Sequence, residues 1–88
     1  MQVIVTNQFE KDASKELDKN LQIRLAEIIE GLQSATSLQD LPNLKKLKGY
    51  KNYFRIKLSD YRIGFVYESN EITLCRVMHR REIYRYFP

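Results

Sequence analysis

The sequence is poor in the residues that build disulfides, metal sites and phosphate-binding loops. Among its 88 residues there are one cysteine, one histidine and three glycines. A lone cysteine cannot form an internal disulfide, and Cys75 with His79 supplies only two metal-type ligands, too few for a structural zinc site. The sequence contains no glycine-rich phosphate loop, internal repeat or low-complexity segment. We therefore expect neither a bound metal nor a cofactor.

Long apolar runs are also missing. No stretch approaches the roughly 18–20 residues of a membrane span. The first residues, MQVIVTNQFEK, lack the charged start and long apolar segment of a signal peptide. We expect a protein of the reducing cytoplasm in which Cys75 is a small core residue. The length fits one domain, residues 1–88, with one modest core.

Positive charge is abundant, and it is concentrated in the second half of the chain. Residues 1–44 hold four basic and seven acidic side chains, a net charge of −3, whereas residues 45–88 hold eleven basic and four acidic ones, a net charge of +7. The total of +4 conceals this division. Such asymmetry points to a polyanionic partner for the second half.

The first half predicts a strand followed by helices. Residues 2–6, QVIVT, are β-branched and short, as in a strand. Asn7 and Glu10 have the spacing of a capping box at a helix start. The apolar residues that follow recur at helical spacing in two stripes, Phe9–Leu17 and Leu21–Leu32. The polar residues between the stripes leave two readings open, two helices or one broken helix.

The second half changes to the period of two that marks strands. After a loop at residues 33–45 we predict three strands, at residues 53–58, 61–67 and 72–80, and then a short tail or helical turn. The order β-α-α-β-β-β predicts an α+β fold. In this fold two helices pack on one face of a mostly antiparallel four-stranded sheet.

The opposite face of that sheet is predicted to be cationic. Arg55 and Lys57 alternate with apolar residues, so their side chains emerge side by side, and Arg62 joins them across a turn. Gly64 leaves room on the same face for a backbone or a base to approach, although a glycine within a strand as often marks a β-bulge. The facing of Arg76 is ambiguous. Because adjacent like charges destabilise a sheet, their presence favours an anion-binding site, and a clustered basic face is typical of nucleic-acid binding.

Aromatic residues near these cations strengthen the prediction of a nucleic-acid partner. They are Tyr53, Tyr84, Tyr86 and Phe87. A base that stacks on an aromatic ring gains about 1–3 kcal/mol. The alternative is that some of these rings only close the edge of the core, and for Tyr84 and Tyr86 both interpretations stay open.

RNA can be cleaved without a metal when its 2′-hydroxyl attacks the adjacent phosphate. The reaction needs a base, cations for the developing negative charge, and an acid for the leaving 5′-oxygen. A lysine can be the base when neighbouring arginines disfavour its protonated form, and Lys57 lies among such arginines. His79 is a candidate acid, because histidine exchanges protons near neutral pH, although a lone histidine near a strand end is more often structural.

Two long stretches, LKKLKGYKNYFRIKLSDYRIGFVYE (44–68) and ITLCRVMHRREIYRYF (72–87), resemble the RelE branch of the RelE/ParE superfamily of toxins from type II toxin–antitoxin pairs. The resemblance covers nearly the whole chain. It implies a small RNase-like fold and an endoribonuclease that cuts mRNA, typically in the ribosomal A site. It also implies a cognate antitoxin that silences the toxin in a hetero-oligomeric complex.

The same resemblance implies roles for individual residues. The basic strand pair falls on Arg55 and Lys57, the transition-state arginine on Arg62, and the proposed general acid on Arg80. The stacking tyrosine falls on Tyr86 or Tyr84. Arg55 stands where the family has lysine, which suits anion binding but not a base. The predicted catalytic residues are Lys57, Arg62, Arg80, His79 and Tyr86, and the predicted RNA-binding residues are Arg55, Arg76, Arg81, Tyr84 and Lys48.

The sequence leaves two other functions open. A ParE-like toxin would poison DNA gyrase through protein contacts, and the same fold supports both activities. ParE-type chains generally lack the full cationic set that this chain has. A degenerate toxin would bind only its antitoxin.

Overall fold

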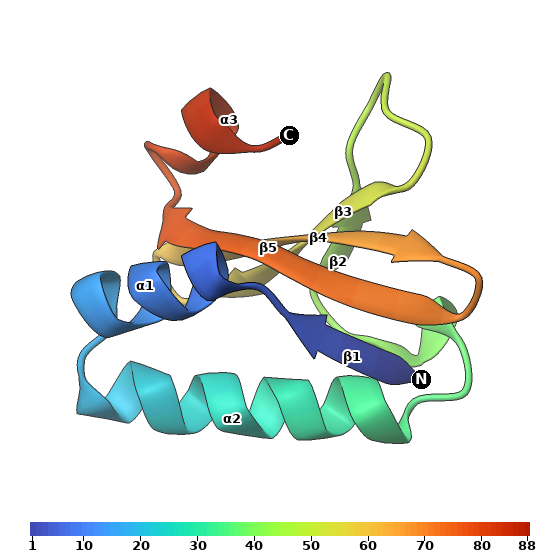
Figure 1. Ribbon diagram of the computed structural model, residues 1–88, viewed down its shortest axis with the longest axis horizontal. Coiled ribbons are helices and arrows are strands. Elements are labelled where there is room, and N and C mark those ends of the chain that lie inside the picture. Colours follow the sequence, from blue (N-terminus) through green and yellow to red (C-terminus); the bar gives the residue numbers. More distant parts are fainter.

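The computed structural model describes residues 1–88 and contains a five-stranded sheet with helices against it (Figure 1). The strand order is β1-β5-β4-β3-β2, with β1 parallel to β5 and the other neighbours antiparallel. The strands are β1 (Gln2–Val5), β2 (Leu44–Lys46), β3 (Tyr53–Leu58), β4 (Tyr61–Glu68) and β5 (Glu71–His79). The helices are α1 (Asn7–Glu16), α2 (Lys19–Ser34), the 3₁₀ turn η1 (Leu38–Asp40) and α3 (Ile83–Tyr86).

The predicted α+β fold is confirmed, but the sheet has one strand more than predicted. The extra strand is β2, which begins in the segment predicted as a loop and pairs with β3. With three residues, two of them lysines, it is too short to show a period of two. None of the helices combines the length and the apolar character needed to cross a membrane.

Side-chain caps set where the helices begin. The hydroxyl of Thr6 accepts a hydrogen bond from the Phe9 backbone N–H at 3.1 Å, and it donates to the Leu74 carbonyl at 2.8 Å. The capping box predicted at Asn7 is therefore wrong by one residue, because Thr6 can satisfy both the helix start and β5. Asp18 caps α2 by accepting from Leu21 N–H at 2.9 Å, so the chain has two helices rather than one broken helix.

Helices α1 and α2 cover one face of the sheet, as predicted. Their buried residues include Phe9, Leu25 and Leu32. The facing core residues of the sheet are Ile56, Leu58, Ile63, Phe65, Ile72, Leu74 and Val77. This is the main core, and it holds the three long strands in the orientation that exposes their other face.

A β-bulge in β5 resolves the ambiguous facing of Arg76. Gly64 pairs with Arg76 while the next residue, Phe65, pairs with Leu74, so Cys75 is an extra residue on β5. Leu74 and Val77 both point into the helix-side core. Arg76 therefore lies on the opposite face, which strict alternation from Leu74 could not predict. Burial raises the pKa of the Cys75 thiol, in keeping with a packing role.

The second face of the sheet is not the uniformly cationic surface that the sequence predicted. The C-terminal segment folds back over it as α3 (Figure 1), and Ile83 and Phe87 are buried there with Leu47. The Phe87 ring lies on Gly64, where an added Cβ would meet ring carbons at 2.5–2.7 Å. The space at Gly64 that we expected for a base is thus filled by the chain's own tail.

We predict that Gly64→Ala destabilises the protein by about 1–3 kcal/mol, because the new methyl group overlaps the Phe87 ring in a packed cluster. The measurement is urea unfolding followed by circular dichroism. Gly31→Ala is the matched control, since Gly31 lies inside α2 with nothing within 4 Å of an added Cβ. That control should stabilise the protein by about 0.5–1 kcal/mol. Equal changes in the free energy of unfolding for the two substitutions would contradict the packing of Phe87 on Gly64.

Candidate nucleic-acid interface

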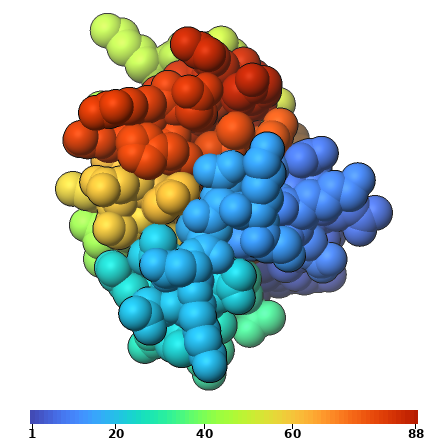
Figure 2. Space-filling view, turned by 90° about the vertical axis from the view of Figure 1, so that its left-hand side faces the viewer, coloured from blue at the N-terminus to red at the C-terminus, as the bar shows by residue number.

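Two predicted site residues face each other at one end of the sheet, and the backbone of a third, Arg80, reaches the same turn. Lys57 and Arg62 are directly opposite each other on β3 and β4. One guanidinium nitrogen of Arg62 donates to the carbonyls of Ser59 at 3.0 Å and Tyr61 at 2.8 Å, which holds this side chain against the β3–β4 turn. The backbone N–H of Arg80 donates to the Asp60 carbonyl of the same turn at 2.7 Å. In Figure 2 the C-terminal segment lies directly against this turn.

A second row of residues crosses four strands beside the first. Lys45 of β2 pairs with Arg55, Arg55 with Gly64, and Gly64 with Arg76. The Nε atom of Arg55 is buried and has no hydrogen-bond partner. An unsatisfied buried donor is costly, so Arg55 is a guanidinium with donor capacity that the free protein does not use.

A shallow hollow of about 320 Å³ joins the two rows at the β2 edge. It is lined by Asn43, Leu44, Lys45, Arg55 and Lys57. Three cations thus surround one hollow that contains no carboxylate. An anion bound there would relieve the repulsion between neighbouring like charges.

Arg76, which the sequence predicted to bind RNA, is instead paired within the protein. Its Nε and a terminal nitrogen donate to the Asp12 carboxylate at 2.7 and 3.1 Å. The same carboxylate accepts from the Val77 backbone N–H at 3.2 Å. The hydrogen bond to Asp12 raises the pKa of Arg76, and the Arg76 guanidinium lies 5.5 Å from the centre of the Tyr86 ring. The Asp12 carboxylate already balances the charge of Arg76, and the Arg76 guanidinium supports the Tyr86 ring.

His79 does not join the cluster of Lys57 and Arg62. It pairs with Tyr61 in the register, and the two rings meet edge to face at 5.6 Å. This places His79 two residues beyond Val77 on the helix-covered face, whereas Lys57 and Arg62 lie on the other. Its Nδ1 atom accepts from the Arg81 N–H at 3.2 Å. Of the two candidate acids, Arg80 has its backbone bonded to the β3–β4 turn, whereas the His79 ring lies on the face opposite Lys57.

The aromatic residues separate into two groups. Phe87 is buried and Tyr53 packs beside it, with ring centres 5.5 Å apart, so these two close the edge of the core. Tyr84 and Tyr86 are 57% and 52% exposed, and both are accessible to a base. The side chain of Arg81 is exposed as well.

Lys48 lies elsewhere, on the loop between β2 and β3. This loop is at the opposite end of β3 from Lys57. Lys48 is therefore not part of the cluster around the β3–β4 turn.

Sequence reasoning missed two residues that shape the interface. Lys45 was missed because β2 is only three residues long. The apolar Leu44 followed by the charged Lys45 was a weak indication of a strand. Asp12 was overlooked as one more helix charge. Its position three residues after Phe9, on the side of the apolar stripe, could have indicated a buried carboxylate in need of a cation.

We predict that Asp12 and Arg76 are energetically coupled. Replacing either by alanine should cost about 1–3 kcal/mol, because the remaining group loses its partners in a largely buried place. A double-mutant cycle measured by urea unfolding should give a coupling free energy of about 1 kcal/mol or more. The exposed pair of Glu82 and Arg85 is the control and should couple by about 0.5 kcal/mol or less. Strictly additive losses at Asp12 and Arg76 would refute the ion pair.

Comparison with known proteins relates the whole chain to one group. Residues 3–84 match the family described as "ParE toxin of type II toxin-antitoxin system, parDE". The protein named Toxin RelE3 from Methanocaldococcus jannaschii is 43% identical over 89 residues, which covers 100% of each chain.

Solved structures share the fold. A chain of the RelB–RelE antitoxin–toxin complex from Methanococcus jannaschii superposes with a TM-score of 0.81 at 39% identity, covering 97% of this chain and 99% of that one. A chain of the archaeal RelE–RelB complex from Pyrococcus horikoshii OT3 gives a TM-score of 0.72 at 22% identity, with 90% and 93% covered.

Proposed function

Because this chain belongs to the RelE/ParE superfamily and is a toxin of a type II toxin–antitoxin pair, we propose that it is a metal-independent endoribonuclease. Its substrate is mRNA, cut in the ribosomal A site, and the consequence is inhibition of translation in the cytoplasm. The observation that supports this proposal most strongly is the pairing of Lys57 with Arg62 at the turn that the Arg80 backbone also bonds, beside a hollow lined by Lys45 and Arg55.

The proposed reaction uses the 2′-hydroxyl of the RNA as nucleophile. The amine of Lys57 accepts the proton of this hydroxyl as the oxygen attacks the adjacent phosphorus. The bond from phosphorus to the 5′-oxygen breaks, Arg80 donates a proton to that oxygen, and a 2′,3′-cyclic phosphate remains. Arg55 and Arg62 bind the non-bridging oxygens and stabilise the added negative charge of the transition state.

The position of Arg62 suits this role. Two backbone carbonyls fix one of its terminal nitrogens, so the guanidinium is held in place before RNA binds. The remaining N–H groups of its planar fork can donate to phosphate oxygens. A prearranged donor of this kind needs little reorganisation during the reaction.

The proposed protein partner is a cognate antitoxin in a hetero-oligomeric complex. Chains of two RelB–RelE complexes share this fold. The net charge of +7 in residues 45–88 would suit a segment rich in acidic side chains. Such an antitoxin would silence the toxin by covering the cationic hollow or by displacing the C-terminal tail.

We predict that Lys57→Ala and Arg62→Ala each lower RNA cleavage by roughly 100-fold or more, the contribution expected of a general base and of a charge-stabilising donor. The assay adds purified protein to a translation reaction and maps the mRNA ends to A-site codons. Lys15→Ala is the matched control, because Lys15 is an exposed lysine on α1 outside both ion pairs, and it should cleave like the parent protein. Undiminished cleavage by the two site variants would refute the residue assignments.

Inhibition of DNA gyrase is the second candidate function, favoured by the ParE description of the matching family. A supercoiling assay with RNA integrity followed in parallel separates the two. Blocked supercoiling with intact mRNA would overturn the nuclease proposal. Absence of growth arrest on expression without an antitoxin would instead indicate a degenerate toxin that only binds its partner.

A further inference from the structure

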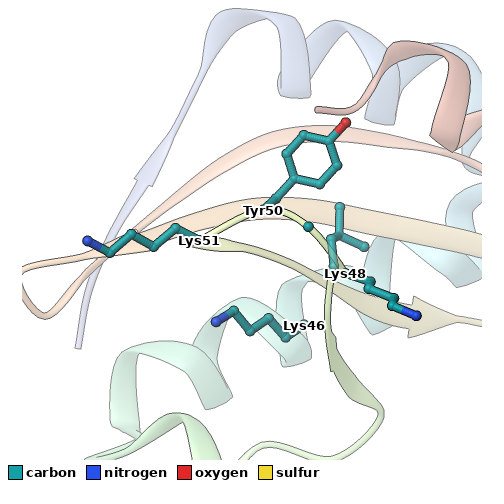
Figure 3. A pocket seen from close by; sticks show the side chains of 6 residues that line it. Lys46, Lys48, Tyr50 and Lys51 are labelled. Carbon is teal, nitrogen blue, oxygen red and sulfur yellow. The ribbon is translucent and has the colours of Figure 1, made fainter.

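The loop between β2 and β3 is a second basic surface, distinct from the cluster around Lys57. We call residues 46–51 the lysine loop, after Lys46, Lys48 and Lys51 (Figure 3). These three lysines are exposed and belong to neither of the two ion pairs in the structure. The loop surrounds an open hollow of about 390 Å³, and none of the six residues that line it is acidic. The proposed cleavage reaction does not use this surface.

The same loop carries an exposed tyrosine. The Tyr50 side chain is 50% exposed, and its ring centre is 5.8 Å from that of Tyr53, which in turn packs on Phe87 at 5.5 Å. Figure 3 shows Lys51 and Lys48 extending from the loop in opposite directions, with the Tyr50 ring on one side of the loop and Lys46 on the other. Lys46 pairs with Phe54 and so belongs to the helix-covered face, whereas Tyr50 packs with Tyr53 on the tail side. A supported aromatic ring beside cations, here Lys48 and Lys51, is the arrangement that single-stranded nucleic acids bind, because bases stack on rings while lysines contact phosphates.

The loop conformation is held by the fold rather than by a ligand. Leu47 is buried under the C-terminal tail, and its N–H donates to the Tyr53 carbonyl at 2.8 Å. The Tyr50 N–H donates back to the Leu47 carbonyl at 3.3 Å. Gly49 has φ +83°, a conformation that favours glycine in such a tight turn. The ring and the lysines are therefore presented in a preformed arrangement.

We propose that the lysine loop is an accessory binding site for single-stranded RNA. In this site a base stacks on Tyr50, and the flanking phosphates contact Lys48 and Lys51. The identification of the nucleic acid as RNA rests on the proposed function. Tyr53 and Lys57 are four residues apart on β3, roughly 13 Å along the strand, so an RNA strand that passes beside the C-terminal tail can reach both sites within a few nucleotides.

The chemistry of the loop favours RNA over an acidic segment of a protein. An amphipathic helix needs an apolar groove, but the only apolar side chains of this hollow are Leu47 and Tyr50, and Leu47 is covered by the tail. An acidic peptide would gain only exposed ion pairs, which contribute little. RNA would gain both a stacked base and the release of counterions from its backbone.

The test measures binding of a fluorescent single-stranded RNA whose sugars all carry 2′-O-methyl groups, so that cleavage cannot occur. Fluorescence anisotropy at several salt concentrations compares the parent protein with a variant in which Lys48 and Lys51 are replaced by alanine. The slope of log K against log salt should fall in magnitude by about 1.4, since each phosphate contact to a single strand contributes roughly 0.7. The control variant loses the same charge on α1, through Lys11→Ala and Lys15→Ala.

A second pair of variants tests stacking without a change of charge. Tyr50→Ala should weaken binding of the same RNA by about 5- to 100-fold, whereas Tyr50→Phe keeps the ring and should bind like the parent protein. Urea unfolding of all variants verifies that Tyr50, which is half exposed, is not needed for folding.

The outcomes distinguish this site from the proposed function. If the loop variant binds the RNA as the α1 control does, the accessory site is refuted, while loss of cleavage in Lys57→Ala would still support the nuclease. If the parent protein cleaves nothing but loses RNA binding when the loop is changed, the site stands and the nuclease fails. If the loop variant loses the antitoxin but not the RNA, the surface binds protein and the proposal is wrong.

Discussion

The contact between the Asp12 carboxylate and β5 is the interaction on which much of this structure depends. It accepts from the Arg76 side chain and from the Val77 backbone immediately beyond the bulge at Cys75. One carboxylate thus fastens α1 to the sheet, neutralises a cation that would otherwise be held without a partner, and fixes the arginine on which Tyr86 lies. Since a buried charge is tolerated only when it is paired and hydrogen-bonded, the bulge, the helix and the C-terminal turn are positioned together.

The C-terminal tail divides the second face of the sheet into an apolar centre and two basic regions. Ile83 and Phe87 bury the centre of the face over Gly64, which has no side chain to oppose them. Cations remain accessible on two sides of this apolar patch, around Lys57 at one end of β3 and on the lysine loop at the other. A surface that composition describes only as basic is therefore two separate basic regions, with a packed aromatic cluster between them.

Much of the fold could be predicted from local patterns. Alternation along residues 53–67 placed Arg55, Lys57 and Arg62 on one face, because a strand directs successive side chains to opposite sides. Two helical stripes marked α1 and α2. The same rules failed where a tertiary contact shifted the pattern. Thr6 rather than Asn7 begins α1 because it also bonds β5, and Arg76 changes face because one extra residue is inserted at the bulge.

The sequence by itself determined the α+β class, the helix-covered face and the concentration of positive charge in the second half, since these follow from periodicity and composition. Only the tertiary structure decided which cations are free. It paired Arg76 with an aspartate 64 residues earlier in the chain, separated His79 from Lys57 by the thickness of the sheet, and brought Lys45 beside Arg55 through a strand too short to recognise. The physical reason is that charge pairing and burial depend on distances in space between residues far apart in sequence, and no local pattern encodes those distances.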